Sequence, residues 1–215
     1  MSDFVLDSVR HLNELLPLKA RQDQLSPALK ALHRAIIESL VARGRAPSRA
    51  EVAEWVGEDQ VDNALVRLGA DDLIVLAADR REILGAYPVT SETTPHTLQV
   101  NATQIHAMCA LDALSVGPMY ELPVVIQSRC RVTGDAIQIK QAGARILSAT
   151  PATTRVGVRW QAPTGSAAHS LCMEMVFLRD DAAAATWHGD DTEYHSVFTL
   201  DEAVDFGARY FRPLL

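Results

Sequence analysis

The hydrophobic pattern of this sequence changes near residue 88, and that change limits the possible folds more than any other feature. Before it, apolar residues recur at helical spacing, whereas after it short strand-like runs are mixed with helical ones. A helical first part followed by short strands with a few helices is typical of an α+β fold. We therefore predict a winged-helix-like helical domain at the N-terminus, followed by a mixed domain of short antiparallel strands and helices.

The N-terminal part is expected to divide into two units. Residues 1–24 are predicted to form a helical arm, because their apolar residues recur near 3.6-residue spacing until Pro17 disturbs the pattern. Residues 25–88 combine three helical patterns with two strand-like runs. Ser48 and Glu51 have the spacing of a capping box at the start of the second helix. Three short helices followed by a hairpin predict a winged-helix-like domain.

Winged helices often bind DNA, but the charges here argue against that role. The third helix, which would enter the major groove, begins with the acidic residues Glu58, Asp59 and Asp62. The whole chain has a net charge of −7, and nucleic-acid affinity comes mainly from Lys and Arg. Arg80 and Arg81 are the one basic pair at the tip of the predicted hairpin. We expect a structural role for this domain and no nucleic-acid partner.

Residues 88–96 are rich in Ser, Thr and Pro and predict a linker to a second domain, residues 97–215. The strands predicted in that domain are 98–102, 124–132, 136–139, 154–160 and 171–178. The predicted helices are 105–116, 182–187 and 200–211. The second domain is therefore expected to be an α+β unit built on antiparallel strands.

The N-terminus and the cysteines indicate the cellular compartment. The first residues, MSDFVLDSVRHLNELL, contain acids early and no apolar core after a basic start, so they do not resemble a secretory signal. No uncharged apolar segment is long enough to span a bilayer. We expect a cytoplasmic protein that does not bind a membrane. Its three cysteines, Cys109, Cys130 and Cys172, are then expected to be free thiols.

Cys109 and Asp112 form the first pattern that suggests chemistry. Residues three apart share one face of a helix, so the thiol and the carboxyl group would lie within reach of each other. Because a carboxylate beside a thiol opposes the ionisation of both, the two groups can share one proton. Such a pair suits a reaction that needs first a thiolate and then a proton donor. Spacing alone nevertheless favours the simpler interpretation, a packed structural cysteine and a solvated aspartate.

Cys172 supplies a second sulfur far along the chain. If it begins a strand, alternation places it on the face of Glu174 and Val176, opposite Met173 and Met175. Two sulfurs without the four-ligand spacing of a zinc site favour a soft metal of low coordination number.

The other candidate residues receive no chemical role from the sequence. Cys130 has no second cysteine nearby, and we interpret it as a packed structural thiol. His106 and His169 flank the candidate site in the sequence. A single histidine near a helix start or a strand end is more often a surface or hydrogen-bonding residue than a ligand, so neither is assigned a function.

Four segments together resemble the bacterial alkylmercury lyases. They are LGAYPVT (84–90), HAMCALDAL (106–114), SRCRVTG (128–134) and SLCMEM (170–175). Each segment is unspecific alone, whereas their order and approximate spacing are fairly specific. The resemblance extends from about residue 83 to the C-terminus.

This resemblance implies an enzyme that cleaves the carbon–mercury bond of alkyl- and arylmercury compounds by protonolysis, releasing a hydrocarbon and Hg(II). The active-site residues of the family fall on Cys109, Asp112 and Cys172. The two cysteines would hold the mercury of substrate and product, with Asp112 as a further ligand. The structural cysteine of the family falls on Cys130. Met173 is a departure, because some members carry a second, adjacent cysteine at this position.

The implied chemistry needs no organic cofactor, because sulfur itself activates the bond to mercury. Consistently, the sequence contains no Gly-rich phosphate-binding loop. Cellular thiols would deliver the organomercurial substrate and accept the product, and the family implies a mercuric reductase as the partner that receives Hg(II). We expect an apolar, partly closed site with Met108 and Leu111 as neighbours.

Three other interpretations remain open at this point. A winged-helix transcriptional regulator could sense a soft metal through Cys109 and Cys172 without turnover, although the acidic third helix argues against it. A cysteine hydrolase would need a histidine base, and His106 lies three residues before Cys109. A family member that binds mercury without cleaving the bond would have the same sequence features.

Overall fold

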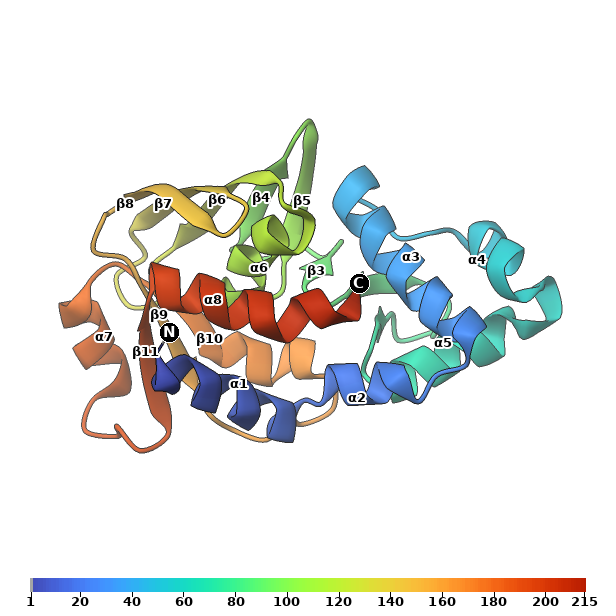
Figure 1. The fold of residues 1–215 in the computed structure, drawn as a ribbon, viewed down its shortest axis with the longest axis horizontal. Coiled ribbons are helices and arrows are strands. Elements are labelled where there is room, and N and C mark those ends of the chain that lie inside the picture. Colours follow the sequence, from blue (N-terminus) through green and yellow to red (C-terminus); the bar gives the residue numbers. More distant parts are fainter. Residues whose placement is uncertain (1) are drawn as a thin grey trace.

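A computed structural model describes residues 2–215 and has an α+β architecture, with helices packed around two antiparallel sheets (Figure 1). The helices are α1 (Asp3–Leu15), α2 (Leu18–Asp23), α3 (Pro27–Arg43), α4 (Arg49–Val56), α5 (Val61–Ala70), α6 (Ala110–Tyr120), α7 (Asp181–His188) and α8 (Leu200–Phe211). Four 3-10 turns are η1 (Glu58–Gln60), η2 (Ala167–His169), η3 (Leu171–Glu174) and η4 (Arg212–Leu214). The strands are β1 (Val75–Leu76), β2 (Ile83–Ala86), β3 (Val89–Thr90), β4 (Thr97–Val100), β5 (Thr103–Ala107), β6 (Pro123–Arg129), β7 (Ala136–Ala142), β8 (Arg145–Thr150), β9 (Arg155–Arg159), β10 (Met175–Leu178) and β11 (His195–Thr199).

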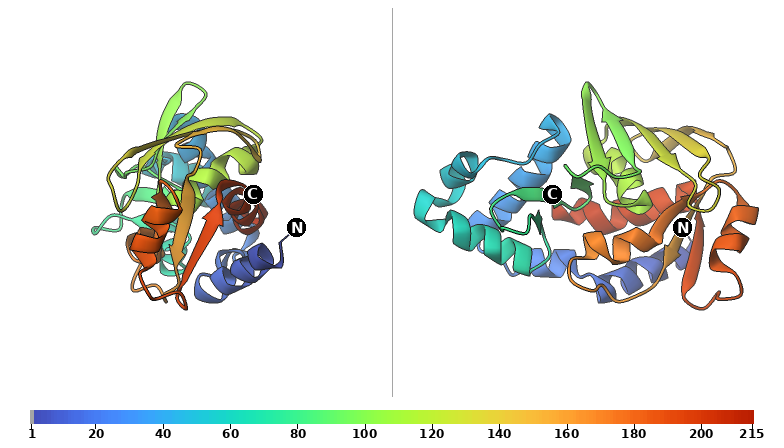
Figure 2. Two further views of the ribbon diagram at one scale, coloured as in Figure 1. Left: turned by 90° about the vertical axis from the view of Figure 1, so that its left-hand side faces the viewer. Right: turned by 180° about the vertical axis from the view of Figure 1, so that it is seen from behind.

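Local signals determine the ends of the N-terminal helices. Helix α3 begins after Ser26, whose side chain accepts the backbone N–H of Leu29, and ends at Gly44 with a φ of 68°. Helix α4 has the capping box that the sequence predicts, with Ser48 and Glu51 each accepting the backbone N–H of the other. Helices α3, α4 and α5 lie at one end of the molecule, and α7 with the neighbouring strand β11 lies toward the other (Figure 2).

The larger sheet has eight strands in the order β1-β2-β3-β5-β4-β6-β7-β8, and all its pairs are antiparallel. The composition of residues 88–96 predicts a linker, but β3 lies inside this segment. Val89 and Thr90 are buried and pair with both β2 and β5, so the linker prediction is wrong for these two residues. The hairpin of β1 and β2 therefore continues directly into the main sheet.

Helix α6 forms the centre of the core. Its residues Ala110 to Met119 are all buried, and it packs against α8, the main sheet and β10. The predicted helix 105–116 begins too early, because residues 103–107 form strand β5. The β-branched Thr103 and Ile105 favour a strand there, and Ile105 and Ala107 point into the core. Cys109 then caps the helix instead of lying within it.

The C-terminal segments complete the fold. Strands β10, β9 and β11 form the smaller antiparallel sheet in that order. Helix α8 starts at a capping box of Thr199 and Glu202, crosses the middle of the molecule in Figure 1, and packs between α6 and α1. The predicted strand 171–178 is correct only for β10, because residues 171–174 form the 3-10 turn η3. Strands β8 and β11 are not predicted from the sequence.

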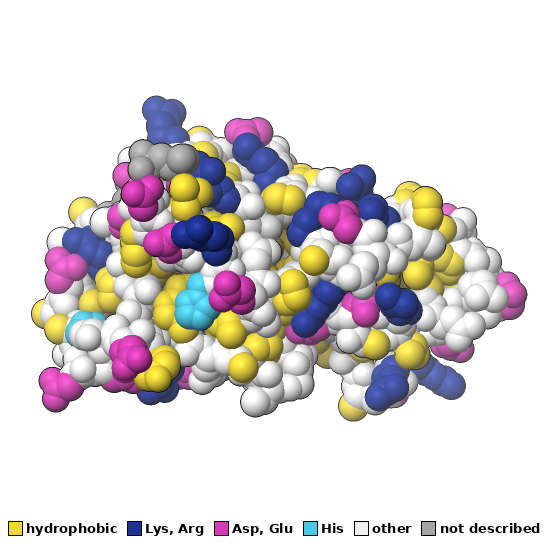
Figure 3. Space-filling view, turned by 60° about the horizontal axis from the view of Figure 1, so that its bottom comes forward, with side chains coloured by type: hydrophobic (Ala, Val, Ile, Leu, Met, Phe, Trp, Pro, Cys, Tyr) yellow, Lys and Arg dark blue, Asp and Glu magenta, His cyan; other side chains and the backbone are white. Residues whose placement is uncertain are grey.

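The surface of the molecule carries charges of both signs (Figure 3). On the face shown in Figure 3, basic and acidic side chains are interspersed and do not gather in one large area of either charge. Within residues 2–215, every helix is too short or too polar to cross a lipid bilayer.

Candidate active site

Cys109 and Asp112 lie at the N-terminal end of α6. Cys109 is the N-cap residue, with extended backbone angles of φ −150° and ψ 179°. Its Sγ accepts the backbone N–H of Asp112 at 3.4 Å, in the manner of a serine or threonine cap. The sequence predicts that these two side chains share a helix face. They do lie together, but the geometry of a helix cap brings them there.

Cys172 reaches the same place from the 3-10 turn η3, just before β10. It is not a strand residue, so the predicted alternation with Glu174 and Val176 is wrong. Because β10 packs against α6, the turn lies over the start of this helix. One ligand atom each from Cys109, Asp112 and Cys172 all lie within 4.8 Å of one another. The structure thus brings together the three residues that the sequence singles out.

All three side chains are buried, with exposed fractions of 0% for Cys109, 1% for Asp112 and 4% for Cys172. Burial raises the pKa of Asp112 to about 7, although hydrogen bonds with Cys109 oppose this rise. Burial also raises the pKa of Cys109 well above its ordinary value, helped by its hydrogen bond with Cys172 and by the charge of Asp112. The hydrogen bond with Cys109 lowers the pKa of Cys172, but burial and the nearby carboxylates leave it raised. At neutral pH the two thiols therefore keep their protons, whereas Asp112 is close to the midpoint of its titration.

Two further features mark this cluster as more than packed core. The Oδ2 atom of Asp112 is buried and has no hydrogen-bond partner within the described residues. Native proteins rarely tolerate such an atom without a reason, because its desolvation is not compensated. In addition, the thioether Sδ of Met175 lies 3.7 Å from the Sγ of Cys109. The surroundings are rich in sulfur and suit a soft metal ion better than a hard one.

A pocket of about 390 Å³ leads to this cluster from the surface. Its wall includes Cys172 and an apolar set of side chains, Met108, Met173, Met175, Val176 and Phe177. Cys109 and Asp112 do not line the pocket and lie behind Cys172. The expected neighbour Met108 is part of the wall, whereas Leu111 is not. The pocket can take a small apolar group and present it to Cys172.

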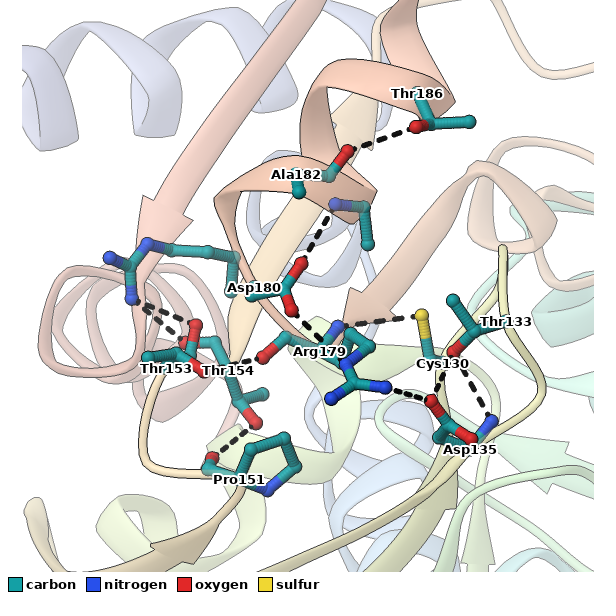
Figure 4. A network of polar contacts seen from close by, with 12 residues as sticks. Cys130, Thr133, Asp135, Pro151, Thr153, Thr154, Arg179, Asp180, Ala182 and Thr186 are labelled. Atoms are coloured by element: carbon teal, nitrogen blue, oxygen red, sulfur yellow. Dashed lines mark hydrogen bonds and ion pairs between the residues drawn. The ribbon is translucent and has the colours of Figure 1, made fainter.

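Cys130 lies at the end of β6, in a polar network apart from the cluster (Figure 4). Its Sγ accepts the backbone N–H of Arg179 at 3.4 Å, and the side chain of Arg179 pairs with Asp135. Burial acts to raise the pKa of Cys130, but hydrogen bonds from Thr133, Arg179 and Val132 leave it lowered. The network joins the β6–β7 turn to the end of β10. Cys130 also contributes to the pocket wall.

The two histidines near the cluster have other partners. The Nδ1 atom of His106 accepts the backbone N–H of Thr94 at 3.4 Å. His169 pairs with Glu92 at 2.9 Å, at the edge of the pocket. In the described part of the chain, the recorded polar contacts of Cys109 are with Asp112, Cys172 and Met175, and none is with a histidine. This arrangement gives no support to a cysteine hydrolase with His106 as its base.

Sequence reasoning does not identify two residues that hold the turn before Cys172. Asp72 and Tyr87 accept the backbone N–H groups of Ala167 and Ala168 at 2.9 and 2.8 Å. Asp72 has a positive φ of 51° in the turn after α5, and no spacing in the sequence connects it to residue 172. Tyr87 belongs to the segment 84–90 that carries the family resemblance, but the resemblance assigns it no role.

Comparison with known proteins identifies the family. The sequence model of the family described as alkylmercury lyase, MerB, matches residues 89–212. The alkylmercury lyase of Staphylococcus epidermidis is 30% identical over 128 residues, which are 58% of this chain and 59% of that protein. The alkylmercury lyase of Bacillus cereus is 26% identical over 202 residues, covering 90% of this chain and 89% of the relative.

A solved structure described as the mercury-bound form of MerB2 shares the fold. It superposes with a TM-score of 0.77 at 21% sequence identity, over 92% of this chain and 98% of that chain. The family model covers more than half of the sequence, including Cys109, Asp112 and Cys172. The chain therefore belongs to the alkylmercury lyase family.

Proposed function

We propose that this chain cleaves the carbon–mercury bond of alkyl- and arylmercury compounds, with Cys109, Cys172 and Asp112 as its catalytic residues. One observation carries the proposal: two thiols and a carboxyl group meet within 4.8 Å in a buried position at the end of an apolar pocket. Two sulfurs suit mercury, which is soft and thiophilic, and the carboxyl group suits the movement of one proton.

Capture of the substrate falls to Cys172, because it lines the pocket and Cys109 lies behind it. The substrate arrives as R–Hg–SR′, bound to a cellular thiol. The sulfur of Cys172 forms a bond to mercury, and the carrier leaves as R′SH with the proton of Cys172. The apolar wall formed by Met173, Met175 and Phe177 then surrounds the R group.

Cys109 adds as the second sulfur. Its pKa is raised well above the ordinary value, so it needs a base, and Asp112 is the carboxylate beside it. The proton moves from Cys109 to Asp112 as the second sulfur–mercury bond forms. With a pKa of about 7, Asp112 can accept a proton and release it again near neutral pH.

Protonation of the carbon completes the reaction. Two sulfur ligands increase the electron density on the carbon bound to mercury, and Asp112 delivers to it the proton that came from Cys109. The carbon–mercury bond breaks, the hydrocarbon RH leaves, and Hg(II) stays between the two sulfurs. Of the two cysteine protons, one leaves in R′SH and the other in RH.

The same chemistry bears on cofactors, partners and compartment. Sulfur activates the substrate, so we propose that no organic cofactor takes part and that free thiols remove Hg(II) and return the enzyme to its starting state. A mercuric reductase is the recipient that the family suggests. Cys109 and Cys172 are unpaired in the structure although they are close together. This arrangement favours a reducing compartment, and we propose the cytoplasm.

We also propose a division of the chain into a helical arm (1–24), a winged-helix-like domain (25–88) and a catalytic α+β domain (97–215). The arrangement of the middle part supports the winged-helix interpretation, because α3, α4 and α5 are followed by the antiparallel pair β1 and β2. The 3-10 turn η1, which precedes α5, carries the exposed acids Glu58 and Asp59. These charges support a structural role rather than binding to DNA.

The test of activity is benzene release from phenylmercury in the presence of excess thiol. Cys109→Ala and Cys172→Ala should each lose at least a hundredfold in turnover, because each removes one of the two sulfurs on mercury. Asp112→Ala should still bind mercury but release benzene slowly. Cys130→Ala is the matched control and should keep most of its turnover. Wild-type protein that binds phenylmercury without releasing benzene would contradict the proposal and favour a mercury-binding regulator or a non-catalytic binder.

A single-turnover experiment separates the two sulfurs. If Cys172 captures the substrate, Cys109→Ala should still release the carrier thiol and retain one phenylmercury per chain, whereas Cys172→Ala should release almost none. Release of carrier by Cys172→Ala at the wild-type rate would show that Cys109 reacts first.

A further inference from the structure

The turn that carries Cys172 is held by residues that precede the part of the chain matched by the family model. The first turn of η2 has backbone N–H groups that its own N-cap residue, Ser166, does not bind. The Oδ2 atom of Asp72 accepts the N–H of Ala167 at 2.9 Å, and the hydroxyl of Tyr87 accepts the N–H of Ala168 at 2.8 Å. Asp72 and Tyr87 thus cap this turn from outside.

The two capping groups are themselves connected. The hydroxyl of Tyr87 donates to Oδ1 of Asp72 at 3.1 Å, and the hydroxyl of Ser166 donates to the same oxygen at 2.9 Å. Tyr87 is 1% exposed, and Ala167 and Ala168 are buried. Hydrogen bonds in such surroundings fix their partners closely, because a broken bond would leave a buried polar group without a partner.

This cluster, which we call the turn clamp (Asp72, Tyr87 and residues 166–168), lies next to the reactive sulfur in the chain. η3 begins at Leu171, three residues after Ala168, and Cys172 is its second residue. Ser170 joins the two turns, because its hydroxyl donates to the carbonyl of Ser166 at 2.9 Å and its carbonyl accepts the N–H of Met173 at 3.1 Å. A displacement of residues 166–168 is therefore passed on to Cys172.

The two cysteines are held very differently. Cys109 is the cap of a fully buried helix, whereas Cys172 is on a short turn with an irregular backbone. A 3-10 turn of three or four residues contributes little stability of its own. The distance between the two sulfurs therefore depends on what holds the turn. Asp72, in the turn between α5 and β1, and Tyr87, directly after β2, bind the turn through hydrogen bonds.

We infer that Asp72 and Tyr87 are positioning residues that hold the Cys172 turn over Cys109 and Asp112, so that mercury can be bound by both sulfurs at once. The inference rests on the proposed function. It gives the segment before residue 89 an indirect part in the reaction, because that segment keeps the sulfur of Cys172 within reach of Cys109. Among the described residues, the hydrogen bonds of Asp72 and Tyr87 go to each other and to residues 166–168, and none goes to the side chain of Cys109, Asp112 or Cys172.

The test uses Tyr87→Phe, Asp72→Ala and the conservative Asp72→Asn in the full-length chain. Tyr120→Phe is the matched control for the tyrosine, because the Tyr120 hydroxyl is buried with no partner in the described part of the chain. Asp71→Asn is the matched control for the aspartate, because the neighbouring Asp71 pairs with Arg67 instead of the turn.

In the variants of Asp72 and Tyr87, we expect kcat to fall while KM changes little. In Tyr87→Phe, kcat for benzene release should fall about tenfold, the factor expected for one buried hydrogen bond, while KM changes less than threefold. Capture by Cys172 alone survives a loose turn, but addition of the second sulfur does not. Asp72→Ala should lose more than Tyr87→Phe, and Asp72→Asn should lie between wild type and Asp72→Ala because it keeps an acceptor for Ala167. Both controls should retain wild-type kcat.

Two measurements do not depend on turnover and separate this inference from the proposed function. Hydrogen–deuterium exchange of the segment 166–172 should speed up about tenfold in the clamp variants and stay unchanged in the controls. With Hg(II) as the probe, the ultraviolet band of a mercury dithiolate should weaken in the clamp variants at equal metal loading. If wild type releases no benzene, the proposed function fails, while these two measurements still test the clamp.

Three results would overturn the inference. The first is wild-type exchange and wild-type kcat in Asp72→Ala and Tyr87→Phe. The second is a loss of kcat that follows the melting temperature equally in clamp variants and controls, which indicates general destabilisation. The third is an unchanged dithiolate band, because it shows that both sulfurs still reach mercury without the clamp.

Discussion

Replacing Asp112 by asparagine should make the protein more stable at neutral and alkaline pH while abolishing turnover. The carboxyl group is 1% exposed, and one of its oxygens has no partner among the described residues. Its ionisation in the folded state is therefore costly. A pKa raised from 3.8 to about 7 corresponds to about 4 kcal/mol of folding free energy lost when the group is fully ionised.

The direction of the pH dependence follows from this raised pKa. The folded protein keeps the proton of Asp112 at pH values where the unfolded chain has already lost it. The stabilisation from this proton is complete below about pH 4, is lost progressively as the pH rises to about 7, and changes no further above that. Asparagine does not titrate, so the variant does not lose this stability as the pH rises. Its stability relative to wild type should increase by about 3 kcal/mol between pH 5 and pH 8.

Urea unfolding of wild type and Asp112→Asn at pH 5, 6, 7 and 8, with reductant present, measures this difference. Other titrating groups, including the buried His33 and His96, are common to both proteins and cancel in the comparison. Any fixed cost of burying the amide appears equally at every pH. A stability difference that stays constant from pH 5 to pH 8 would refute the reasoning, because it would mean that Asp112 titrates in the folded state as it does in the unfolded chain.

Three other measurements test the site and its support. The kcat/KM for phenylmercury should fall as the pH is lowered through about 7, because protonated Asp112 cannot accept the proton of Cys109; an ascending limb centred below pH 5 would contradict this assignment. Cys130→Ala should unfold in urea with about 1 kcal/mol less stability, since it loses a buried sulfur that accepts the N–H of Arg179, but its turnover should stay within threefold of wild type. Gly207→Ala should cost about 2 kcal/mol, because the new Cβ would lie 2.1 Å from the Oγ of Ser115 and would push α8 away from α6; unchanged stability would show that this contact relaxes freely.

The elements that could be predicted from the sequence are those with local signals. The capping-box spacing at Ser48 gives the start of α4, and the helical pattern of residues 200–211 gives α8 with the bounds that the structure has. Strand β8 has no such signal, because its residues are exposed or half-buried and show no alternation. It is a strand because β7 provides hydrogen-bond partners, which the sequence of residues 145–150 does not reveal.

The site was predictable in composition but not in geometry. The spacing of Cys109 and Asp112 indicates a contact between them, and the contact exists through the helix cap. The approach of Cys172 depends on the packing of β10 against α6, so no spacing predicts it, and only the family resemblance suggested it. Asp72 and Tyr87 could not be found at all. Their hydrogen bonds to residues 166–168 join positions about 80 to 95 residues apart through tertiary structure alone.

The burial of α6 limits which residues around the site can change during evolution. Two of the three reacting side chains, Cys109 and Asp112, stand at the start of a helix whose residues 110–119 are all buried, where a change of side-chain volume disturbs the core packing. The third, Cys172, is buried but lines the pocket, and the next residue, Met173, is 49% exposed. New substrate preferences are therefore easiest to acquire on the Cys172 side, where residues can be exchanged while the proton-transfer pair remains untouched.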